Sequence, residues 1–340
     1  MAKAILRVND CGIYCEAGGF YVDPWRPVDR AIVTHAHSDH ARVGMKHYLC
    51  SAEGYRVTRR RLGDDASIES LEFGEQKTIG SAKVSLHPAG HILGSAQVRI
   101  EVDGQIAVVS GDYKTDPDPT TAPFEPIRCH LFITESTFGL PIYRWPDQAS
   151  VFAEINAWWR ANQAAGRASL LMGYALGKAQ RALSGLDPSI GDIYLHGSVH
   201  QLTELYREQG VNLPATKLIS EVGPKVDWSQ AMIVAPPSAS GSPWVRRFGD
   251  HSTAFCSGWM AVRGTRRRRA LDRGFVLSDH VDWPSLLSTI QATQAQEVWV
   301  THGYRDTVVR YLTELGMKAK VLETQFEGEL DDQPLEVAEA

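Results

Sequence analysis

The sequence contains, at Thr34-His35-Ala36-His37-Ser38-Asp39-His40, four potential metal ligands within six residues. The β-branched run Ala31-Ile32-Val33 comes directly before it and predicts a buried strand. Polar side chains that follow such a strand lie just beyond its carboxyl end, where a loop can turn them toward a common point. The first two histidines are two residues apart and point the same way in an extended stretch, whereas the last two ligands need a tight turn. Three imidazoles and a carboxylate suit zinc, manganese or iron better than magnesium.

The composition is that of a soluble globular protein. The 340 residues, of which 43% are hydrophobic and 22% charged, suffice for one large domain or two smaller ones. We expect no membrane association and a cytoplasmic location, because the sequence lacks a long apolar run and a signal peptide and its five cysteines are scattered. The net charge of −5 means that nucleic acid would need a local basic surface. The run Arg266-Arg267-Arg268-Arg269 is one candidate, and a solvated helix face is its alternative explanation.

Further apolar strands end in His, Asp or Glu, which is how a sheet edge builds a site. In chain order, these strands or the loops after them present Asp23, His91, Asp112, Glu135, His280 and His302. His91 stands in an irregular loop with two glycines and a proline, which can present one side chain. His87, shortly before it, is a weaker candidate for the same position.

The middle of the chain has a different character. Helices alternate there with apolar strands, which predicts a second α/β domain with a parallel sheet. We therefore expect one metal-binding domain interrupted by an inserted domain, with segments 1–145, 146–264 and 265–328 and an acidic tail, 329–340. Within the inserted part, Gly173 to Gln180 opens a helix. Its backbone N–H groups and Lys178 would cradle a phosphate, the alternative being a plain strand-to-helix turn.

Together these motifs resemble the β-CASP subfamily of the metallo-β-lactamase proteins, whose known members mostly cut nucleic acids. The resemblance runs from Asp23 to His302 and implies an α/β fold, a metallo-β-lactamase αββα sandwich interrupted by an inserted β-CASP α/β cap domain. It is carried by His-x-His-x-Asp-His at 35–40, His91, Asp112, Glu135-Ser136-Thr137, Gly173-Tyr174-Ala175-Leu176-Gly177-Lys178-Ala179-Gln180, Ser278-Asp279-His280-Val281-Asp282 and Thr301-His302-Gly303. The stretch from Phe255 to Trp283 is similar to bacterial ligase-associated DNA exonucleases, which are encoded beside an ATP-dependent DNA ligase and a helicase.

The resemblance also implies a role for each matching residue. Two divalent metal ions, zinc as first choice and manganese as second, would activate a bridging hydroxide. His280 would protonate the leaving oxygen, and Glu135 would orient His280 and raise the pKa of its ring. Either could instead be a buried polar group at a strand end. One ion would be bound by His35, His37 and His91, the other by Asp39, His40 and His302, and Asp112 would bridge them; Asp39 is also counted as catalytic. Asp23 and Asp282 would support the ligands. The substrate-binding residues would be Lys178, Arg266, Arg267, Arg268 and Arg269.

The implied function is metal-dependent hydrolysis of DNA phosphodiester bonds by a repair exonuclease that acts with an ATP-dependent DNA ligase and a helicase. Glu135 and His302 follow the pattern of RNA-processing members, so an RNA-processing nuclease of the mRNA 3′-end type stays open. We expect DNA, because little sequence follows His302 to hold the appended domains of the RNA nucleases. A small-molecule hydrolase such as a thioesterase or lactonase would lack the inserted domain and His280. A catalytically dead scaffold would lack ligands that are all present here.

Overall fold

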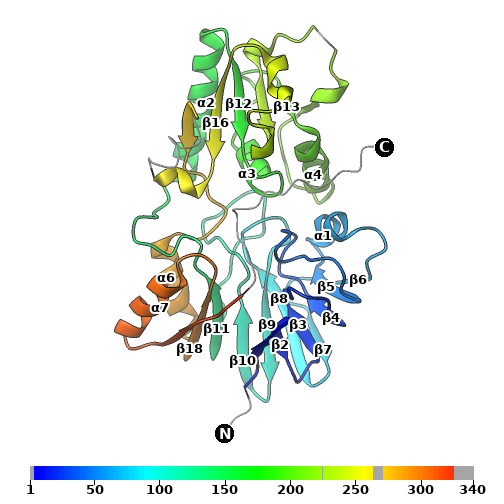
Figure 1. The fold of residues 1–340 in the computed structure, drawn as a ribbon, viewed down its shortest axis with the longest axis vertical. Helices are drawn as coiled ribbons and strands as arrows, with labels where there is room; N and C mark the ends of the chain where they lie inside the picture. The colour runs from blue at the N-terminus through cyan, green and yellow to red at the C-terminus, as the bar shows by residue number, and fades with distance from the viewer. Residues whose placement is uncertain (1–3, 224, 263–270, 325–340) are drawn as a thin grey trace. The chain divides into compact units, whose positions relative to one another are not determined.

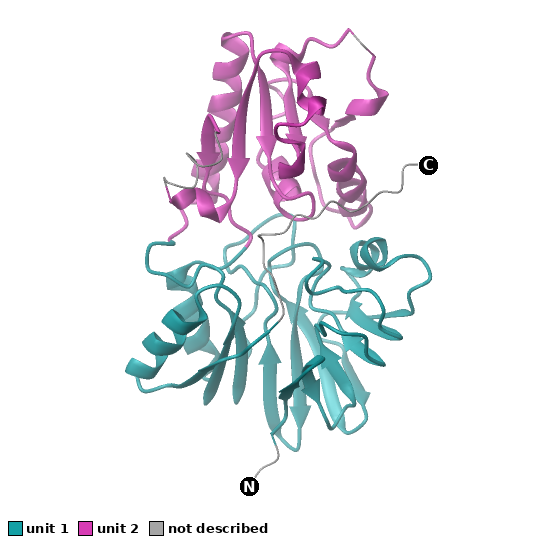
Figure 2. Ribbon diagram, viewed as in Figure 1, with its two compact units in different colours: residues 1–143, 280–328 teal, residues 144–279, 329–340 magenta. Residues whose placement is uncertain are grey.

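The computed structural model describes residues 4–223, 225–262 and 271–324. The chain divides into two compact units, drawn in teal and magenta in Figure 2. Unit 1 contains the described residues up to Tyr143 and those from His280 onward, and unit 2 contains those from Arg144 to Asp279. The predicted basic run 266–269 and the predicted acidic tail 329–340 lie outside the described residues. Among the helices that the structure describes, none is both long and apolar enough to cross a membrane.

Unit 1 is built on two mixed sheets, with strand orders β1-β2-β3-β4-β5-β6 and β19-β18-β11-β10-β9-β8-β7. The strands of the first sheet are β1 (Arg7–Asn9), β2 (Gly12–Cys15), β3 (Phe20–Val22), β4 (Arg30–Ile32), β5 (His47–Ser51) and β6 (Ile68–Leu71). Those of the second are β7 (Gln76–Ile79), β8 (Ala82–Pro88), β9 (Ala96–Val102), β10 (Gln105–Val109), β11 (Leu131–Glu135), β18 (Glu297–Thr301) and β19 (Lys318–Val321).

Burial explains why these sheets form layers. Val22 and Ile32 from the first sheet share one apolar cluster with Val84 and Val98 from the second, so the two sheets pack face to face. Helix α1 (Tyr55–Leu62) covers the outer face of the first sheet, and α6 (Trp283–Thr293) and α7 (Arg305–Glu314) cover that of the second (Figure 1). The predicted αββα sandwich is confirmed.

Unit 2 has one sheet, in which all paired strands are parallel, in the order β14-β13-β15-β12-β16-β17. This confirms the parallel sheet predicted from alternating strands and helices. Its strands are β12 (Ala168–Met172), β13 (Ile193–Leu195), β14 (Lys217–Leu218), β15 (Met232–Ala235), β16 (His251–Cys256) and β17 (Arg273–Phe275). Its helices are α2 (Gln148–Ala164), α3 (Lys178–Ser184) and α4 (Gly197–Glu208), with 3₁₀ turns η1 (Ile219–Glu221), η2 (Trp228–Gln230), η3 (Pro237–Ala239), η4 (Pro243–Phe248) and η5 (Gly258–Ala261).

The chain leaves unit 2 later than the sequence suggested. We expected the return at residue 265, but β17 extends the parallel sheet by pairing Cys256 of β16 with Phe275. The Phe275 ring packs against Trp158 of α2, with ring centroids 5.8 Å apart. This burial within unit 2 holds the segment there, and unit 1 resumes at His280.

The topology of the second sheet of unit 1 gathers polar side chains at one edge. Strands β10, β11 and β18 are parallel neighbours, with Val109 opposite Ile133 and Glu135 opposite Thr301. Because parallel strands end at the same edge, the residues that follow them, Asp112 and His302, lie near Glu135. The sheet thereby presents three of the predicted site residues at one place.

Candidate metal centre

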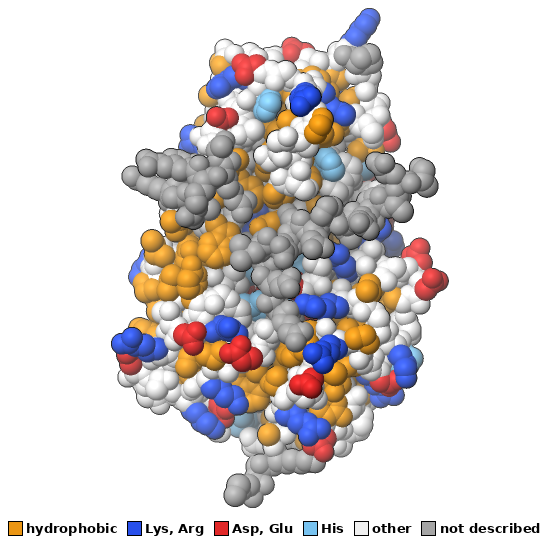
Figure 3. Space-filling model, viewed as in Figure 1, with side chains coloured by type: hydrophobic (Ala, Val, Ile, Leu, Met, Phe, Trp, Pro, Cys, Tyr) orange, Lys and Arg blue, Asp and Glu red, His pale blue; other side chains and the backbone are white. Residues whose placement is uncertain are grey.

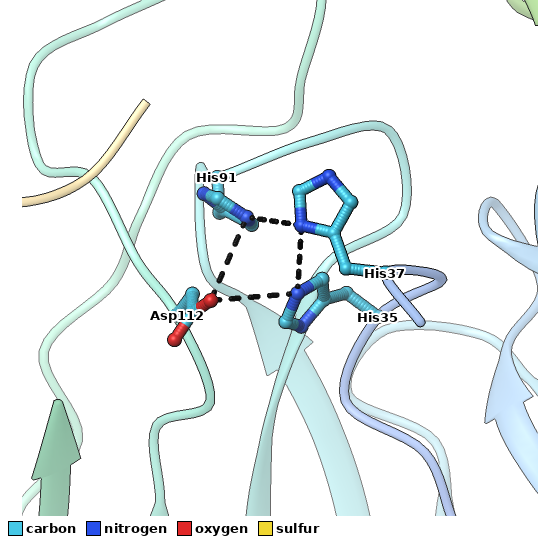
Figure 4. A group of neighbouring side chains, drawn as sticks. All are labelled: His35, His37, His91 and Asp112. Carbon is cyan, nitrogen blue, oxygen red and sulfur yellow. Dashed lines mark hydrogen bonds and ion pairs between the residues drawn. The ribbon is translucent and has the colours of Figure 1, made fainter. Parts of the chain in front are cut away.

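Three histidines and one aspartate form the first cluster (Figure 4). His35 and His37 come from the loop after β4, His91 from the loop between β8 and β9, and Asp112 from the segment after β10. His37 Nδ1 lies 3.1 Å from His35 Nε2 and 3.1 Å from His91 Nε2. Asp112 Oδ2 lies 3.5 Å from His35 Nε2 and 3.9 Å from His91 Nε2. The four side chains therefore converge on one point.

The second cluster consists of Asp39, His40 and His302. Asp39 Oδ2 lies 3.6 Å from His40 Nε2 and 4.0 Å from His302 Nε2, and the two imidazole rings are stacked with centroids 5.2 Å apart. Asp112 Oδ2 also lies 3.5 Å from His40 Nε2. The same carboxylate oxygen thus faces both clusters, which is the position of a bridging ligand.

The donor atoms fit bound metal ions. A Zn–N distance of about 2.0–2.1 Å places neighbouring ligand atoms of a tetrahedron about 3.3 Å apart, close to the spacing of the ring nitrogens in the first cluster. Asp112 Oδ1 is buried and has no hydrogen-bond partner among the described residues. A buried carboxylate oxygen in that position is costly unless a cation or donor meets it.

The protonation of His35 and Asp112 suits metal binding, whereas His40 must lose a proton to bind a metal ion: burial opposes its charge, but Asp39, Asp112 and Asp23 raise the pKa of its ring well above the usual value. Burial, together with the charges of His40 and His91, holds the pKa of His35 well below its usual value, so its ring is neutral. Burial opposes ionisation of Asp112, but His40, and then His280 and His302, hold the pKa of its carboxyl well below the usual range. Neutral imidazole and ionised carboxylate are the forms that bind metal.

Partner groups fix the orientation of two ligand rings. Asp23, directly after β3, has Oδ2 2.7 Å from His40 Nδ1, which turns Nε2 of that ring toward the cluster. Thr34 donates its backbone N–H and its hydroxyl to the same aspartate, at 2.8 and 2.6 Å. The Thr301 hydroxyl lies 2.6 Å from His302 Nδ1. Sequence reasoning predicted the supporting role of Asp23 but missed both threonines, because a threonine beside a histidine carries no distinctive signal.

The backbone at the centre has restricted geometry at two of its residues. Asp23 and His302 have φ values of +43° and +53°, in the left-handed region that non-glycine residues seldom adopt. Gly111, just before Asp112, has φ +58°, and an added Cβ would lie 2.7 Å from the Thr34 side chain. Only glycine allows the strand to approach the metal-binding loop this closely.

A histidine–glutamate pair lies beside the first cluster. His280 Nδ1 is 2.9 Å from Glu135 Oε2 and 3.0 Å from Oε1, and Glu135 Oε1 accepts the backbone N–H of Tyr113 at 2.8 Å. The His280 ring is 4.6 Å from the His91 ring, centroid to centroid. His280 and Glu135 are both buried. The glutamate therefore holds the ring through Nδ1, and Nε2 is the ring nitrogen on the side away from this contact.

Two predicted residues have different surroundings from those expected. Lys178, expected to bind substrate phosphate, is fully buried and pairs with the buried carboxylate of Asp279, so its ammonium does not face solvent. Asp282, expected to support the metal ligands, is the N-cap of α6 and accepts the Ser285 backbone N–H at 3.0 Å. The Lys178 charge is paired inside unit 2, and its binding to substrate stays a prediction. The predicted substrate-binding run Arg266 to Arg269 lies outside the described residues.

Known proteins resemble this chain over long stretches. A "Probable DNA ligase" of Opitutus terrae is 33% identical over 310 residues, which cover 91% of this chain and 30% of that protein. An "RNase J-like protein" of Methanocaldococcus jannaschii is 26% identical over 58% of this chain and 54% of that protein. An "Endoribonuclease ysh1" of Aspergillus fumigatus is 34% identical over 35% of this chain and 14% of that protein. The chain thus spans well under two thirds of the length of these relatives.

The fold is a metallo-β-lactamase sandwich with an inserted β-CASP domain. We call unit 1, which contains the two-sheet sandwich, the metallo-β-lactamase domain, and unit 2, which contains the parallel sheet, the β-CASP domain. The two His/Asp clusters are typical of the dinuclear metal site of this fold. A solved structure of a protein of unknown function from Enterococcus faecalis V583 has a similar fold, with a TM-score of 0.59, 12% identity and coverage of 88% of this chain and 80% of that one. No family model matches the chain.

Proposed function

We propose that the protein is a metal-dependent nuclease that hydrolyses DNA phosphodiester bonds. The proposal rests on the position of Asp112 Oδ2, which lies 3.5 Å from His35 Nε2 of the first cluster and 3.5 Å from His40 Nε2 of the second. One divalent ion, zinc as first choice, would be held by His35, His37 and His91, and a second by Asp39, His40 and His302, with Asp112 serving both. When bound, the ions would lower the pKa of water and offset the charge of the reacting phosphate.

The chain's own residues would do the remaining work. Asp23 and Thr301 hold their partner histidines with Nε2 available to a ligand, which fixes the geometry before substrate arrives. His280, held through Nδ1 by Glu135, would donate a proton from Nε2 to the leaving oxygen. The buried position of this pair keeps bulk water away from the transferred proton.

We propose DNA as the substrate and exonucleolytic repair, together with a DNA ligase, as the process. Support comes from the Opitutus relative, whose name is that of a DNA ligase and which aligns with 91% of this chain. RNA is the alternative, supported by relatives named endoribonuclease over shorter stretches. We place the protein in the cytoplasm, in keeping with its five free cysteines.

A direct test compares end-labelled single-stranded DNA, double-stranded DNA and RNA of one sequence with the metal-loaded protein. We expect a ladder of shortened DNA products, at a rate at least about tenfold above that on RNA, and loss of cleavage in chelator with recovery on adding back zinc or manganese. Faster RNA cleavage would replace the substrate assignment. Cleavage of all three that survives chelation would overturn the metal-dependent mechanism.

A further inference from the structure

A row of aromatic rings in the β-CASP domain runs from the core to the surface. Tyr194 of β13 contacts Trp228 of η2, which contacts Phe248 of η4, with ring centroids 4.9 and 5.0 Å apart. Phe248 contacts Trp244, and Trp244 contacts His196, each with centroids 4.9 Å apart. Tyr194 and Phe248 are buried in the apolar cluster of this domain, whereas Trp244 and His196 are half-buried. The core therefore anchors Trp244 and His196, while part of each side chain stays open to solvent.

Two exposed arginines, Arg246 and Arg247, belong to the same turn, η4, as Trp244. The Arg247 guanidinium carbon lies 5.7 Å from the Trp244 ring centroid, which is a cation–π contact. Neither arginine forms an ion pair with a carboxylate in the part of the chain that the structure describes. By contrast, the exposed Arg160 of α2 pairs with Asp187 at 2.8 Å. The positive charge of η4 is thus not neutralised by an ion pair with the described residues.

The His196 ring is fixed and uncharged. It is the N-cap of α4, with Nδ1 accepting the Ser198 backbone N–H at 3.2 Å and lying 2.9 Å from Ser198 Oγ. Burial, and then the charge of Arg247, hold the pKa of this ring below its usual value, so it is neutral at pH 7. A neutral imidazole beside Trp244 enlarges the flat apolar surface and leaves the charge to the arginines. We call His196, Trp244, Arg246 and Arg247 the Trp244 surface.

Flat and cationic groups together select one class of partner. On the face of the β-CASP domain drawn in Figure 3, hydrophobic side chains, histidines and Lys or Arg side chains all reach the surface. An apolar protein partner would cover the two guanidinium groups of the Trp244 surface without supplying a counter-charge, which is costly. A single strand of nucleic acid supplies both, because its bases stack on aromatic rings and guanidinium planes and its phosphates accept from arginine. We propose that the Trp244 surface holds one nucleotide of a single-stranded segment of the substrate, with the base stacked on the Trp244–Arg247 pair and the adjacent phosphate bound by Arg247 N–H groups. The proposal rests on the proposed nuclease function and adds to it a site that holds the strand.

The phosphate contact is tested with Arg247→Gln on the full chain in chelator, so that the strand is not cut. Arg160→Gln is the matched control, because Arg160 is exposed in the same domain but already paired. Binding of a short fluorescein-labelled single strand is measured by anisotropy over a range of salt concentrations. We expect Arg247→Gln to weaken binding about tenfold and to reduce the salt slope by about 0.7, the value for one lost phosphate contact on a single strand. Arg160→Gln should bind like the wild type.

The stacked base is tested by removing it. Single strands carry one abasic nucleotide at successive positions, and one position should weaken binding to the wild type about tenfold but not to Trp244→Leu, which is the non-additivity expected of a direct contact. Trp244→Phe retains an aromatic ring and should retain most of the affinity. Trp228→Leu, at another half-buried ring of the row, controls for loosening of the core and should bind like the wild type. If thermal melting shows that Trp244→Leu is unfolded, the same abasic series with Arg247→Gln decides, because the proposed base contacts that guanidinium too.

The outcomes separate the two proposals. If the wild type cleaves DNA or RNA but Arg247→Gln has the affinity and salt slope of Arg160→Gln, only the Trp244-surface proposal fails. A loss of affinity in Arg247→Gln that depends on no single base overturns the stacked nucleotide, since charge attraction alone explains it. If the wild type shows the expected binding pattern but cleaves neither nucleic acid, the nuclease proposal fails and the binding site remains. A wild type that binds no single strand overturns both.

Discussion

His280 could take part in the reaction in two ways. Its ring is held by Glu135, as a proton donor would be, but it also lies within reach of Asp112 and Glu135 in a group that could hold a metal ion. A donor and a ligand make different demands on the same nitrogen, because a ligand Nε2 carries no proton. Replacing this single residue therefore distinguishes the two.

For His280→Ala we expect two bound metal ions and an oligonucleotide affinity within a few fold of the wild type, because the proposed ligands are untouched. Turnover should fall by roughly 10²–10⁴, the usual effect of losing a positioned proton donor. A phosphorothiolate substrate, whose leaving sulfur needs no proton, should recover much of the loss. Elemental analysis and single-turnover kinetics check this, with His87→Ala as the control, since the His87 ring lies at Ser85 Oγ, 3.0 Å away, outside both clusters.

A mutant that has lost an ion would make His280 a ligand. One that cleaves at the wild-type rate would remove His280 from the mechanism.

The candidate ligands could be predicted from sequence because each follows a strand whose apolar pattern is local. The cluster that unites His35, His37, His91 and Asp112 was foreseen on that basis and on the family resemblance. The partner of Lys178 could not be foreseen, because Asp279 is 101 residues away and only the fold brings the two together. Local sequence shows that a lysine begins a helix, but not that its charge will be buried.

Among the elements, α3 and the segment after β17 are joined by that pair. Lys178 is the first residue of α3, and Asp279 follows β17 by four residues, with both side chains almost completely buried. Arg181, also on α3, donates to the Ser278 carbonyl oxygen at 3.3 Å. Because His280 is the next residue along the chain, these contacts also fix the start of the segment that carries it.

We expect Lys178→Met to destabilise the β-CASP domain by about 3–5 kcal/mol, because it leaves the Asp279 charge buried without its partner. The double variant Lys178→Met/Asp279→Leu should recover much of that stability. Urea unfolding followed by tryptophan fluorescence measures both. The control is Lys217→Met, whose partner Asp192 is half exposed and whose solvent-screened ion pair should contribute little to stability. Equal effects of the two lysine substitutions would contradict the importance given to the buried pair.

For strand β17, the sequence predicted that a strand forms but not which sheet it joins. Its apolar Phe275 predicted a strand, but a strand of three residues carries no information about which sheet it joins. The register with β16 and the packing of Phe275 on Trp158 decide that it belongs to the β-CASP domain. The change of compact unit falls between Asp279 and His280, whereas we expected a boundary at residue 265.

For the whole molecule, metal binding should be linked to the stability of one domain. All seven proposed ligands belong to the metallo-β-lactamase domain, so ions stabilise its folded state and not that of the β-CASP domain. At metal concentrations about 1,000 times the dissociation constant, this linkage is worth roughly 4 kcal/mol, or about 8–16 °C in melting temperature.

Calorimetry with and without chelator checks this linkage, and we expect only one of two transitions to move. Asp112→Ala, which removes the ligand common to both clusters, should melt like the chelated wild type and hold less than about one ion per chain. If both transitions shift equally, or if the variant keeps two ions, the domain-limited linkage is wrong.

The interior strand β11 pairs with β10 on one side and with β18 on the other, yet the whole β-CASP domain is encoded between β11 and β18. On a ribosome that adds about 5–20 residues per second, a nascent chain that has completed β11 must wait on the order of ten seconds or more for β18. During that interval β11 is an open sheet edge lined by buried-type residues such as Phe132 and Ile133, the kind of edge that recruits strands from other chains. Co-translational folding of the inserted domain cannot close this edge, because β18 is synthesised only after the whole inserted domain.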